Sequence, residues 1–356
     1  MKVLRRLLCH ALGIAFFPAS PLAGQILKCT VCDFQVEGVV RLGAGKDSGG
    51  VFGDTQTIPR DSRQRYYVLK PGHSDRIFLY DRSGTFIRSI GQPEVKFDPI
   101  NLIQIGPGDS LHVFDNGLKR HFVFTPRLTV ARFDTLPGST TDVLFLEKSG
   151  MVLNSSVLTA AALGFPAHYM VAGKIRKSFG AQSEEYRPDI AYMGWRVLSS
   201  ANKTSLWLIN KTKPVLERWT IDGKLAQAFR LNLSWFREWD TGSRFSAADA
   251  PKPLISAART DTYGRILIIV TVSNPDWKKT IVLKKDIDGT NAVPKDWDDA
   301  LDSYLLVVDP NKQVIVSSAR TDRFLRSFVN DTEVVSVRGS IDSSSIDIVR
   351  FKLVKR

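Results

Sequence analysis

The sequence predicts an all-β protein, a six-bladed β-propeller made of four-stranded antiparallel blades. First, short runs in which apolar and polar residues alternate are joined by tight-turn signals, as in RIFLYDRSGTFIRSIG at 76–91. Second, corresponding turns recur at one or two periods of about 45 residues, the length of one propeller blade; the residues that precede these turns are Tyr80, Phe124, Trp219 and Val308. Third, the strands divide into six groups of four only if one strand near the N-terminus completes the last group.

The blades are expected in chain order at 57–91, 99–136, 142–180, 195–231, 254–321 and 325–355. Blade one reads TIPRD, RYYVLK, RIFLYD and FIRSIG, and the next four ranges divide in the same way at Gly, Pro, Asn and Asp. The last range is one strand short. FQVEGVVRLG at 34–43 alternates well and has no earlier partner, so we expect it to pair with DIVRFKLVK at 347–355. That pairing closes the ring and covers an exposed sheet edge.

One stretch of blade one also carries a resemblance to a known family. RYYVLKPGHSDRIFLYDRSGTFIRSIG at 65–91 resembles a unit of the NHL-type six-bladed propellers, and the likeness is strongest over 57–126. The resemblance implies the fold. It implies little about activity, because that fold serves lyases, lactonase-like enzymes and pure binding proteins.

Residues 1–24 have the layout of a secretory signal. MKVLRR is a positively charged start, LLCHALGIAFF is a short apolar run, and PASPLAG is a small-residue exit. The sequence leaves two readings open, a cleaved signal peptide and an uncleaved membrane anchor. In both, residues 25–356 form a single propeller domain that is periplasmic or secreted, and in the second it is associated with a membrane.

The formal net charge is +13 over 356 residues. A positive field favours acidic partners, although scattered Lys and Arg also simply keep a protein in solution. The densest basic clusters, KIRK at 174–177, KKTIVLKK at 278–285 and RFKLVKR at 350–356, carry no nucleic-acid motif. We therefore expect a protein partner with an acidic surface and no nucleic acid.

The two cysteines after the leader form a C-x-x-C pair, Cys29 and Cys32. A c-type haem site needs His after the second cysteine, where this chain has Asp33, so no haem is expected. A zinc site needs two more ligands nearby, and a thioredoxin-like centre needs a βαβ context. A local structural disulfide remains the prediction for an oxidising compartment.

Chemistry in a propeller is expected at the ring axis, near the start of each innermost strand. Those positions are read as Ile58, Asn101, Asp142, Arg196, Ser256 and Arg326. Two arginines and one aspartate do not make an oxygen cage for Ca²⁺, so no metal and no cofactor is expected. The histidines lie mostly inside strand patterns, and no nucleophile elbow, zinc-protease or phosphate-loop motif occurs. We expect no catalytic residues, with Arg196 and Arg326 as a candidate axial anion site.

Three long connections fall in blades three to five, at 181–194, 232–253 and 273–302. Connections of this kind emerge at one end of a propeller, so we expect them to crowd together there. These connections carry aromatic and basic side chains, which are residue types that anchor protein interfaces. The alternative is that the insertions pack on each other and bury their own aromatics. The candidate partner-binding residues are Tyr186, Tyr192, Trp235, Phe236, Arg237, Trp239, Phe245, Trp277, Lys278 and Trp297.

Two functions follow as hypotheses. The first is an exported, non-catalytic propeller that acts as a protein-binding or scaffold module, in one version as an extrinsic subunit of a membrane-associated complex. The second is a lyase-type or hydrolase-type propeller enzyme that acts on an anionic small molecule at the axis.

Overall fold

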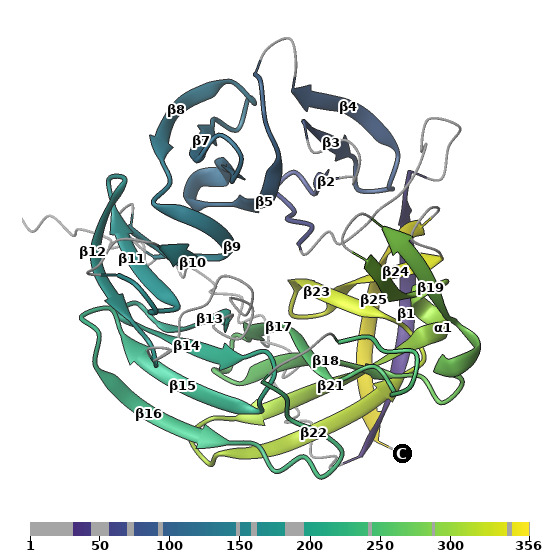
Figure 1. Cartoon of the computed structure of the whole chain (residues 1–356). Coiled ribbons are helices and arrows are strands. Elements are labelled where there is room, and N and C mark those ends of the chain that lie inside the picture. Colours follow the sequence, from purple (N-terminus) through teal and green to yellow (C-terminus); the bar gives the residue numbers. More distant parts are fainter. Residues whose placement is uncertain are drawn as a thin grey trace, which may run out of the picture.

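Six antiparallel sheets surround a common axis in the computed structural model (Figure 1). The structure describes residues 31–43, 57–69, 75–91, 95–146, 150–157, 162–181, 196–240, 244–286, 289–339 and 344–355. Within these ranges, five of the blades are four-stranded sheets, and in blade one a bridge between Arg60 and Tyr66 extends a three-stranded sheet on its inner side. The predicted six-bladed, all-β fold is confirmed.

Blades one to three occupy the first half of the chain. Blade one contains β2 (Tyr66–Leu69), β3 (Arg76–Tyr80) and β4 (Phe86–Gly91). Blade two contains β5 (Ile100–Ile105), β6 (Leu111–Asp115), β7 (Arg120–Phe124) and β8 (Val130–Thr135), with a 3-10 turn at Pro107–Asp109. Blade three contains β9 (Gly138–Phe145), β10 (Gly150–Val157), β11 (Ala167–Val171) and β12 (Lys174–Phe179).

Blades four and five carry the long connections. Blade four contains β13 (Arg196–Asn202), β14 (Ser205–Asn210), β15 (Val215–Thr220) and β16 (Leu225–Arg230). Blade five contains β17 (Leu254–Thr260), β18 (Ile266–Ser273), β21 (Leu301–Asp309) and β22 (Val314–Thr321). Between β18 and β21 the chain forms a 3-10 turn (Trp277–Lys279), a hairpin of β19 (Ile281–Asp286) and β20 (Gly289–Pro294), and the short helix α1 (Trp297–Ala300).

Blade six closes the ring as the sequence predicts. It contains β23 (Leu325–Asn330), β24 (Glu333–Gly339) and β25 (Ser344–Lys355), and its outer strand is β1 (Cys32–Leu42) from the other end of the chain. The pairing of β1 with β25 is antiparallel and runs from Cys32 opposite Lys355 to Leu42 opposite Ile346. The Arg41 guanidinium also forms an ion pair of 2.8 Å with Asp347.

The closing strand passes close to blade one. Gly84 has a φ of +85°, and a Cβ atom there would lie 2.2 Å from the Arg41 carbonyl oxygen. The Gly43 N–H group donates to the Gly84 carbonyl oxygen at 3.0 Å. Glycine is therefore required at position 84, both by the backbone conformation and by the approach of the strand that closes the ring.

The two ends of the ring differ. One end carries tight turns, which in blades one and five repeat the same arrangement: the Asp61 carboxylate accepts from the Arg65 backbone and guanidinium, and Asp261 does the same with Arg265. The other end carries the blade-to-blade connections and the insertions. Apolar side chains fill the space between neighbouring blades, and the first strands of the blades contact each other around the axis.

Candidate functional site

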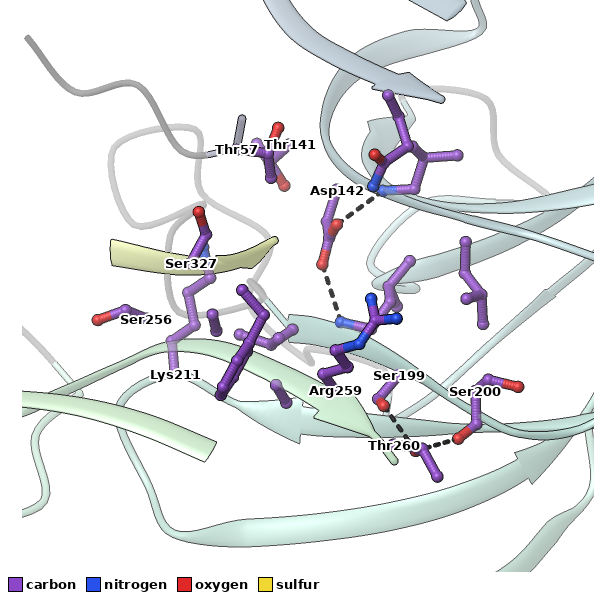
Figure 2. A pocket seen from close by; sticks show the side chains of 18 residues that line it. Thr57, Thr141, Asp142, Ser199, Ser200, Lys211, Ser256, Arg259, Thr260 and Ser327 are labelled. Atoms are coloured by element: carbon purple, nitrogen blue, oxygen red, sulfur yellow. Dashed lines mark hydrogen bonds between the residues drawn. The ribbon is translucent and has the colours of Figure 1, made fainter. Parts of the chain in front are cut away.

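A cavity of about 260 Å³ lies at the axis, and residues from all six blades line it. Most of the polar members belong to the inner strands β9, β13, β17 and β23, and Figure 2 shows their side chains around the cavity. Most are hydroxyl side chains, which are small enough to leave space where six strands converge. The polar lining residues are Thr57, Gln104, Thr141, Asp142, Ser199, Ser200, Lys211, Ser256, Arg259, Thr260 and Ser327.

Asp142 is the carboxylate of this cavity. One of its oxygens accepts the Val143 N–H at 2.8 Å, and the other accepts the Leu198 N–H at 2.9 Å (Figure 2). The second bond joins β9 of blade three to β13 of blade four. Burial raises the pKa of Asp142 to about 6, although the Leu198 N–H and the Lys211 charge both act to lower it.

Lys211 is a cation in the same cavity and is 8% exposed. It lies in the connection between β14 and β15, where the Asn210 side-chain oxygen accepts the Thr212 N–H at 2.9 Å. The Lys211 carbonyl oxygen accepts the Ile255 N–H at 2.8 Å, which ties this turn to blade five. Sequence reasoning did not find Lys211, because it considered only the inner strands as sources of axial residues.

Residues of the insertion at 232–253 contact the turn between β14 and β15 that contains Lys211. The Trp239 N–H donates to the Thr212 carbonyl oxygen at 3.4 Å, and the Lys213 ammonium pairs with Asp240 at 2.7 Å. Neighbouring lysines therefore have different surroundings: Lys211 faces the axial cavity, and Lys213 faces the insertion.

Arg259 and Thr260 line the cavity from the end of β17. The Arg259 guanidinium pairs with Asp331 of blade six at 2.6 Å. The Thr260 hydroxyl bonds to the Ser199 hydroxyl at 2.8 Å and also donates to the Ser200 carbonyl oxygen (Figure 2). These contacts link blades four, five and six around the axis.

Of the six positions predicted to face the axis, Asp142 and Ser256 line the cavity. Ile58 is buried in the core between blades one and six, and Asn101 is exposed. Arg196 is buried, which lowers its pKa against the opposing effect of Glu217. The Arg326 guanidinium lies 5.3 Å from the Phe324 ring centroid. Neither arginine is among the described residues that line the cavity, so the axial anion site they were predicted to form stays a prediction.

The aromatic residues at 232–253 pack mainly inwards. The Trp235 ring stacks on Tyr304 of β21 with centroids 4.2 Å apart, and Phe236 is buried in the core between blades four and five. The Trp239 indole N–H donates to the Pro253 carbonyl oxygen at 2.8 Å. Arg237 is exposed.

The insertions at 232–253 and 273–302 meet over blade six. Residues 182–194 of the third long connection lie outside the described residues, so the predicted crowding of all three stays a prediction. The Trp297 ring stacks on Phe324 at 5.5 Å, and Phe245 meets its edge at 6.0 Å. The Asp298 carboxylate accepts the Gly339 N–H at 2.9 Å. Trp277 is buried and Lys278 is exposed. Tyr186 and Tyr192 lie outside the described residues.

The insertions at 232–253 and 273–302 together form the insertion layer, and the second of them contains the hairpin of β19 and β20. Val282 and Leu283 are 42% and 63% exposed. Since neighbouring strand residues point to opposite faces, the ribbon has an apolar side chain in contact with solvent on each face. An isolated two-stranded ribbon is marginally stable in water. A hydrogen bond at its base helps to hold the two strands together, because the Lys295 N–H donates to the Thr280 carbonyl oxygen at 2.6 Å.

The described cysteine and histidine side chains are not among the residues that line the axial cavity. Cys32 is buried and disulfide-bonded, and Cys29 lies outside the described residues, so their pairing stays a prediction. In blade two, His112 Nδ1 and His121 Nε2 are 2.8 Å apart, and His112 Nε2 lies 2.9 Å from the Ser110 hydroxyl. Within the described ranges, no group of three or more His, Cys, Asp or Glu side chains is arranged to hold a metal ion.

Fold and cavity together define a six-bladed β-propeller with an axial cavity and an insertion layer at one end. Solved structures share this fold. A member of the DUF4221 family from Bacteroides vulgatus is 8% identical, with 91% of this chain and 99% of that chain covered and a TM-score of 0.61. A "putative exported protein" from Bacteroides fragilis is 9% identical over 91% and 99%, with a TM-score of 0.55.

A third structure is a catalytically inactive virginiamycin B lyase from Staphylococcus aureus with quinupristin, 9% identical over 89% and 99%, with a TM-score of 0.51. At these identities the likeness establishes the fold alone. No family model and no curated protein matches the chain, so the NHL resemblance is not confirmed beyond the six-bladed fold. No helix in the described part of the chain is long and apolar enough to cross a membrane.

Proposed function

We propose that this protein is an exported, non-catalytic propeller that binds a partner protein with an acidic surface through the insertion layer of blades four to six. The observation that carries the proposal is the exposure of Val282 and Leu283 on opposite faces of the β19–β20 ribbon. A two-stranded ribbon with exposed apolar side chains gains stability when a partner covers them.

The charges around the ribbon favour an acidic partner. Lys278 and Lys295 are exposed at its base, and Lys279, with its side chain 78% exposed, pairs with the exposed Asp276. Arg237 is exposed on the neighbouring insertion. Complementary charge at the rim of an interface speeds association and selects the partner, and apolar contacts at its centre provide most of the affinity.

The aromatic residues take a supporting role in this proposal. Trp235 and Trp297 each stack on a ring of the propeller body. Their packing holds the insertions in one fixed arrangement before a partner arrives, which reduces the entropy cost of binding. Export is supported by the signal-like leader at 1–24 and by the name of the Bacteroides fragilis neighbour. Attachment to a membrane-associated complex belongs to the same proposal.

The proposal is tested by photo-crosslinking in native cell extracts. A photoreactive residue replaces Leu283 in one variant and Leu225 in the control. Leu225 is 51% exposed on the outer strand of blade four, so the two positions are matched in exposure. We expect one defined partner to crosslink at 283 and not at 225.

Charge reversal tests the electrostatic part. Lys278→Glu with Lys279→Glu should lower partner recovery at least tenfold, and raised salt should lower recovery of the unaltered protein. Lys224→Glu on the outer rim is the control. If the partner crosslinks equally at both positions, or if the charge reversals leave recovery unchanged, the insertion layer is not the docking surface.

A further inference from the structure

The axial cavity carries a second inference, independent of partner docking at the insertion layer. A hydroxyl group both donates and accepts hydrogen bonds. Hydroxyl groups around a small space therefore complement a ligand that has hydroxyl groups of its own. The hydroxyl side chains that line the cavity are Thr57, Thr141, Ser199, Ser200, Ser256, Thr260 and Ser327.

Ser327 of blade six is the member of this lining that has an unsatisfied hydroxyl group. The residue is 3% exposed, and its hydroxyl makes no hydrogen bond within the described part of the chain. Other lining hydroxyls are bonded within the protein: Thr141 donates to the Asn154 side-chain oxygen at 2.6 Å, and Ser199 bonds to Thr260 at 2.8 Å. An unpaired buried hydroxyl is costly. A ligand hydroxyl in the cavity would give Ser327 its partner.

Asp142 lines the same cavity from blade three, which stands opposite blade six in the ring (Figure 1). The Val143 and Leu198 N–H groups each donate to one of its two oxygens and so fix the orientation of the carboxylate. A carboxylate oxygen can accept two hydrogen bonds, so each oxygen keeps one acceptor position beside these backbone bonds. Two neighbouring acceptor positions match two hydroxyl groups on adjacent carbon atoms, an arrangement that sugars have.

The charges of the lining favour a ligand without net charge. An anion would lie beside the Asp142 carboxylate, and a cation would lie beside Arg259 and Lys211. Neither basic residue is free for a ligand: the Arg259 guanidinium pairs with Asp331 at 2.6 Å, and Lys211 has interactions of its own. A neutral ligand avoids repulsion of both signs, so hydrogen bonds and apolar contacts provide its affinity.

The size and the apolar part of the cavity narrow the ligand further. The cavity holds about 260 Å³, just below the roughly 300–1,000 Å³ of pockets for drug-sized ligands. Apolar residues such as Val197 and Phe328 also line it, and a sugar ring has C–H groups that pack against apolar surface. We propose that the axial cavity binds a neutral monosaccharide, with two adjacent hydroxyl groups on Asp142 and a third beside Ser327. No bond is made or broken in this site.

The test uses the full-length protein with D-glucose, D-galactose, D-mannose, D-xylose, L-arabinose and L-fucose, screened by saturation-transfer NMR and quantified by calorimetry. Sodium acetate and methylammonium chloride are the charged probes, and glycerol is a hydroxyl probe without a ring. We expect at least one sugar to bind at least tenfold more tightly than each probe. A probe that binds within tenfold of the best sugar overturns the proposal: acetate would show an anion site, methylammonium a cation site, and glycerol a site that does not select a sugar ring. The absence of sugar binding up to about 50 mM also overturns it.

A matched pair of variants, Ser327→Ala and Ser336→Ala, assigns the binding to the cavity. Ser336 of β24 is also buried in blade six, and its hydroxyl also makes no hydrogen bond within the described residues, but it is not among the residues that line the cavity. Ser327→Ala should weaken sugar binding by about three- to tenfold, the effect of one hydrogen bond, and Ser336→Ala should leave it unchanged. Circular dichroism checks that both fold. Equal affinities in the two variants would contradict the proposed site.

Asp142→Asn tests the other side of the cavity, because it replaces one acceptor oxygen by an amide group and removes the charge. We expect sugar binding to weaken at least tenfold, since hydrogen bonds to a charged acceptor are the stronger ones. In thermal unfolding, the sugar should stabilise the unaltered protein and Ser336→Ala but not Asp142→Asn. A folded Asp142→Asn variant with unchanged affinity would overturn the proposed placement of the ligand. If this variant does not fold, the serine pair decides.

Discussion

The buried histidines of blade two determine part of the acid sensitivity of the fold. His121 stacks on Phe114 with centroids 4.5 Å apart and lies against His112. Burial lowers the pKa of His121 to about 4; burial and the His121 charge lower that of His112 to about 3. The unfolded chain binds protons on these groups below about pH 6.5, while the folded protein does not. Their contribution to stability is therefore present above pH 6.5 and is lost as the pH falls towards 4 and below.

The first prediction concerns His121→Gln, which keeps a hydrogen-bonding side chain and removes one titrating group. We expect a lower free energy of unfolding at pH 7, by about 1–3 kcal/mol, because packing against Phe114 is lost. We also expect a shallower decline between pH 6.5 and pH 4, by up to about 1.4 kcal/mol per pH unit. Urea denaturation at four pH values measures both. A slope equal to that of the unaltered protein would contradict the buried, neutral state of His121.

Asp142 changes the pH dependence of stability in the direction opposite to that of the two histidines. Its folded pKa of about 6 exceeds the ordinary value of 3.8, so the folded protein holds a proton that the unfolded chain releases. Stability is therefore favoured below pH 3.8 and falls as the pH rises towards 6. We predict that Asp142→Asn is less destabilising at pH 7 than at pH 4.5, by on the order of 1–2 kcal/mol. Urea denaturation at the two pH values decides this, and a larger destabilisation at pH 7 would show that the carboxylate is stabilising in its charged form.

Cys32 lies at the start of the closing strand, opposite Lys355 and far from the axial cavity. We predict that Cys29→Ser with Cys32→Ser lowers the free energy of unfolding by about 2 kcal/mol or less, because a disulfide across so short a loop restricts the unfolded chain little. Partner binding should not change. Thiol titration of the protein without residues 1–24 should find no free cysteine; a reactive thiol, with loss of binding in a folded double variant, would assign CTVC a redox or attachment role.

At the scale of elements, the strands and the ring closure were predictable and the insertions were not. The strands could be found because each is a short run rich in apolar residues, bounded by turn signals. Both faces of a blade pack on neighbouring blades, so strands such as β6 and β18 are buried along most of their length and do not alternate. Ring closure followed from counting strands. The β19–β20 hairpin escaped notice because only one of its strands, IVLKKD, has strand composition, and GTNAVP does not.

The axial cavity was predictable only in part, for a geometric reason. Asp142 and Ser256 could be found because inner strands lead to the axis. Lys211 comes from a turn between β14 and β15, and the direction of its side chain depends on the insertion that packs over that turn. Sequence periodicity contains no signal for such a contact. The same argument applies to the tryptophans, whose stacking partners are distant in sequence.

The Trp297 ring stacks on Phe324 and so joins the insertion layer to blade six. Trp297→Ala removes the ring that lies between Phe245 and Phe324. We expect a loss of about 2–4 kcal/mol, in the lower part of the range for large-to-small changes because Trp297 is only partly buried. Limited proteolysis should cut the insertions first and leave the ring resistant. Tyr263→Ala, in an exposed turn at the opposite end of the ring, is the control and should change neither.

At the scale of the whole molecule, ring closure depends on one strand pair. Deleting residues 25–43 removes β1 and exposes the edge of β25. We predict aggregation or loss of cooperative unfolding in this variant, because the exposed edge presents unpaired backbone groups. Deleting residues 1–24 alone should leave cooperative unfolding intact. Light scattering and thermal unfolding compare the two, and a soluble, cooperatively folding product of the longer deletion would disprove closure by β1.

The antiparallel pairing of β1 with β25 also determines how the ring responds to force. Cys32 and Lys355 face each other, so the outward ends of both closing strands leave the molecule at the same point. A force that pulls the N-terminal end of β1 away from the C-terminal end of β25 breaks one hydrogen-bonded pair at a time. If these two ends lay at opposite ends of the strand pair, the same force would load all the pairs together. The propeller should therefore yield to a modest pull on its two ends. A tether at one end of the chain leaves the closing pair unloaded, whereas tethers at both ends load it pair by pair.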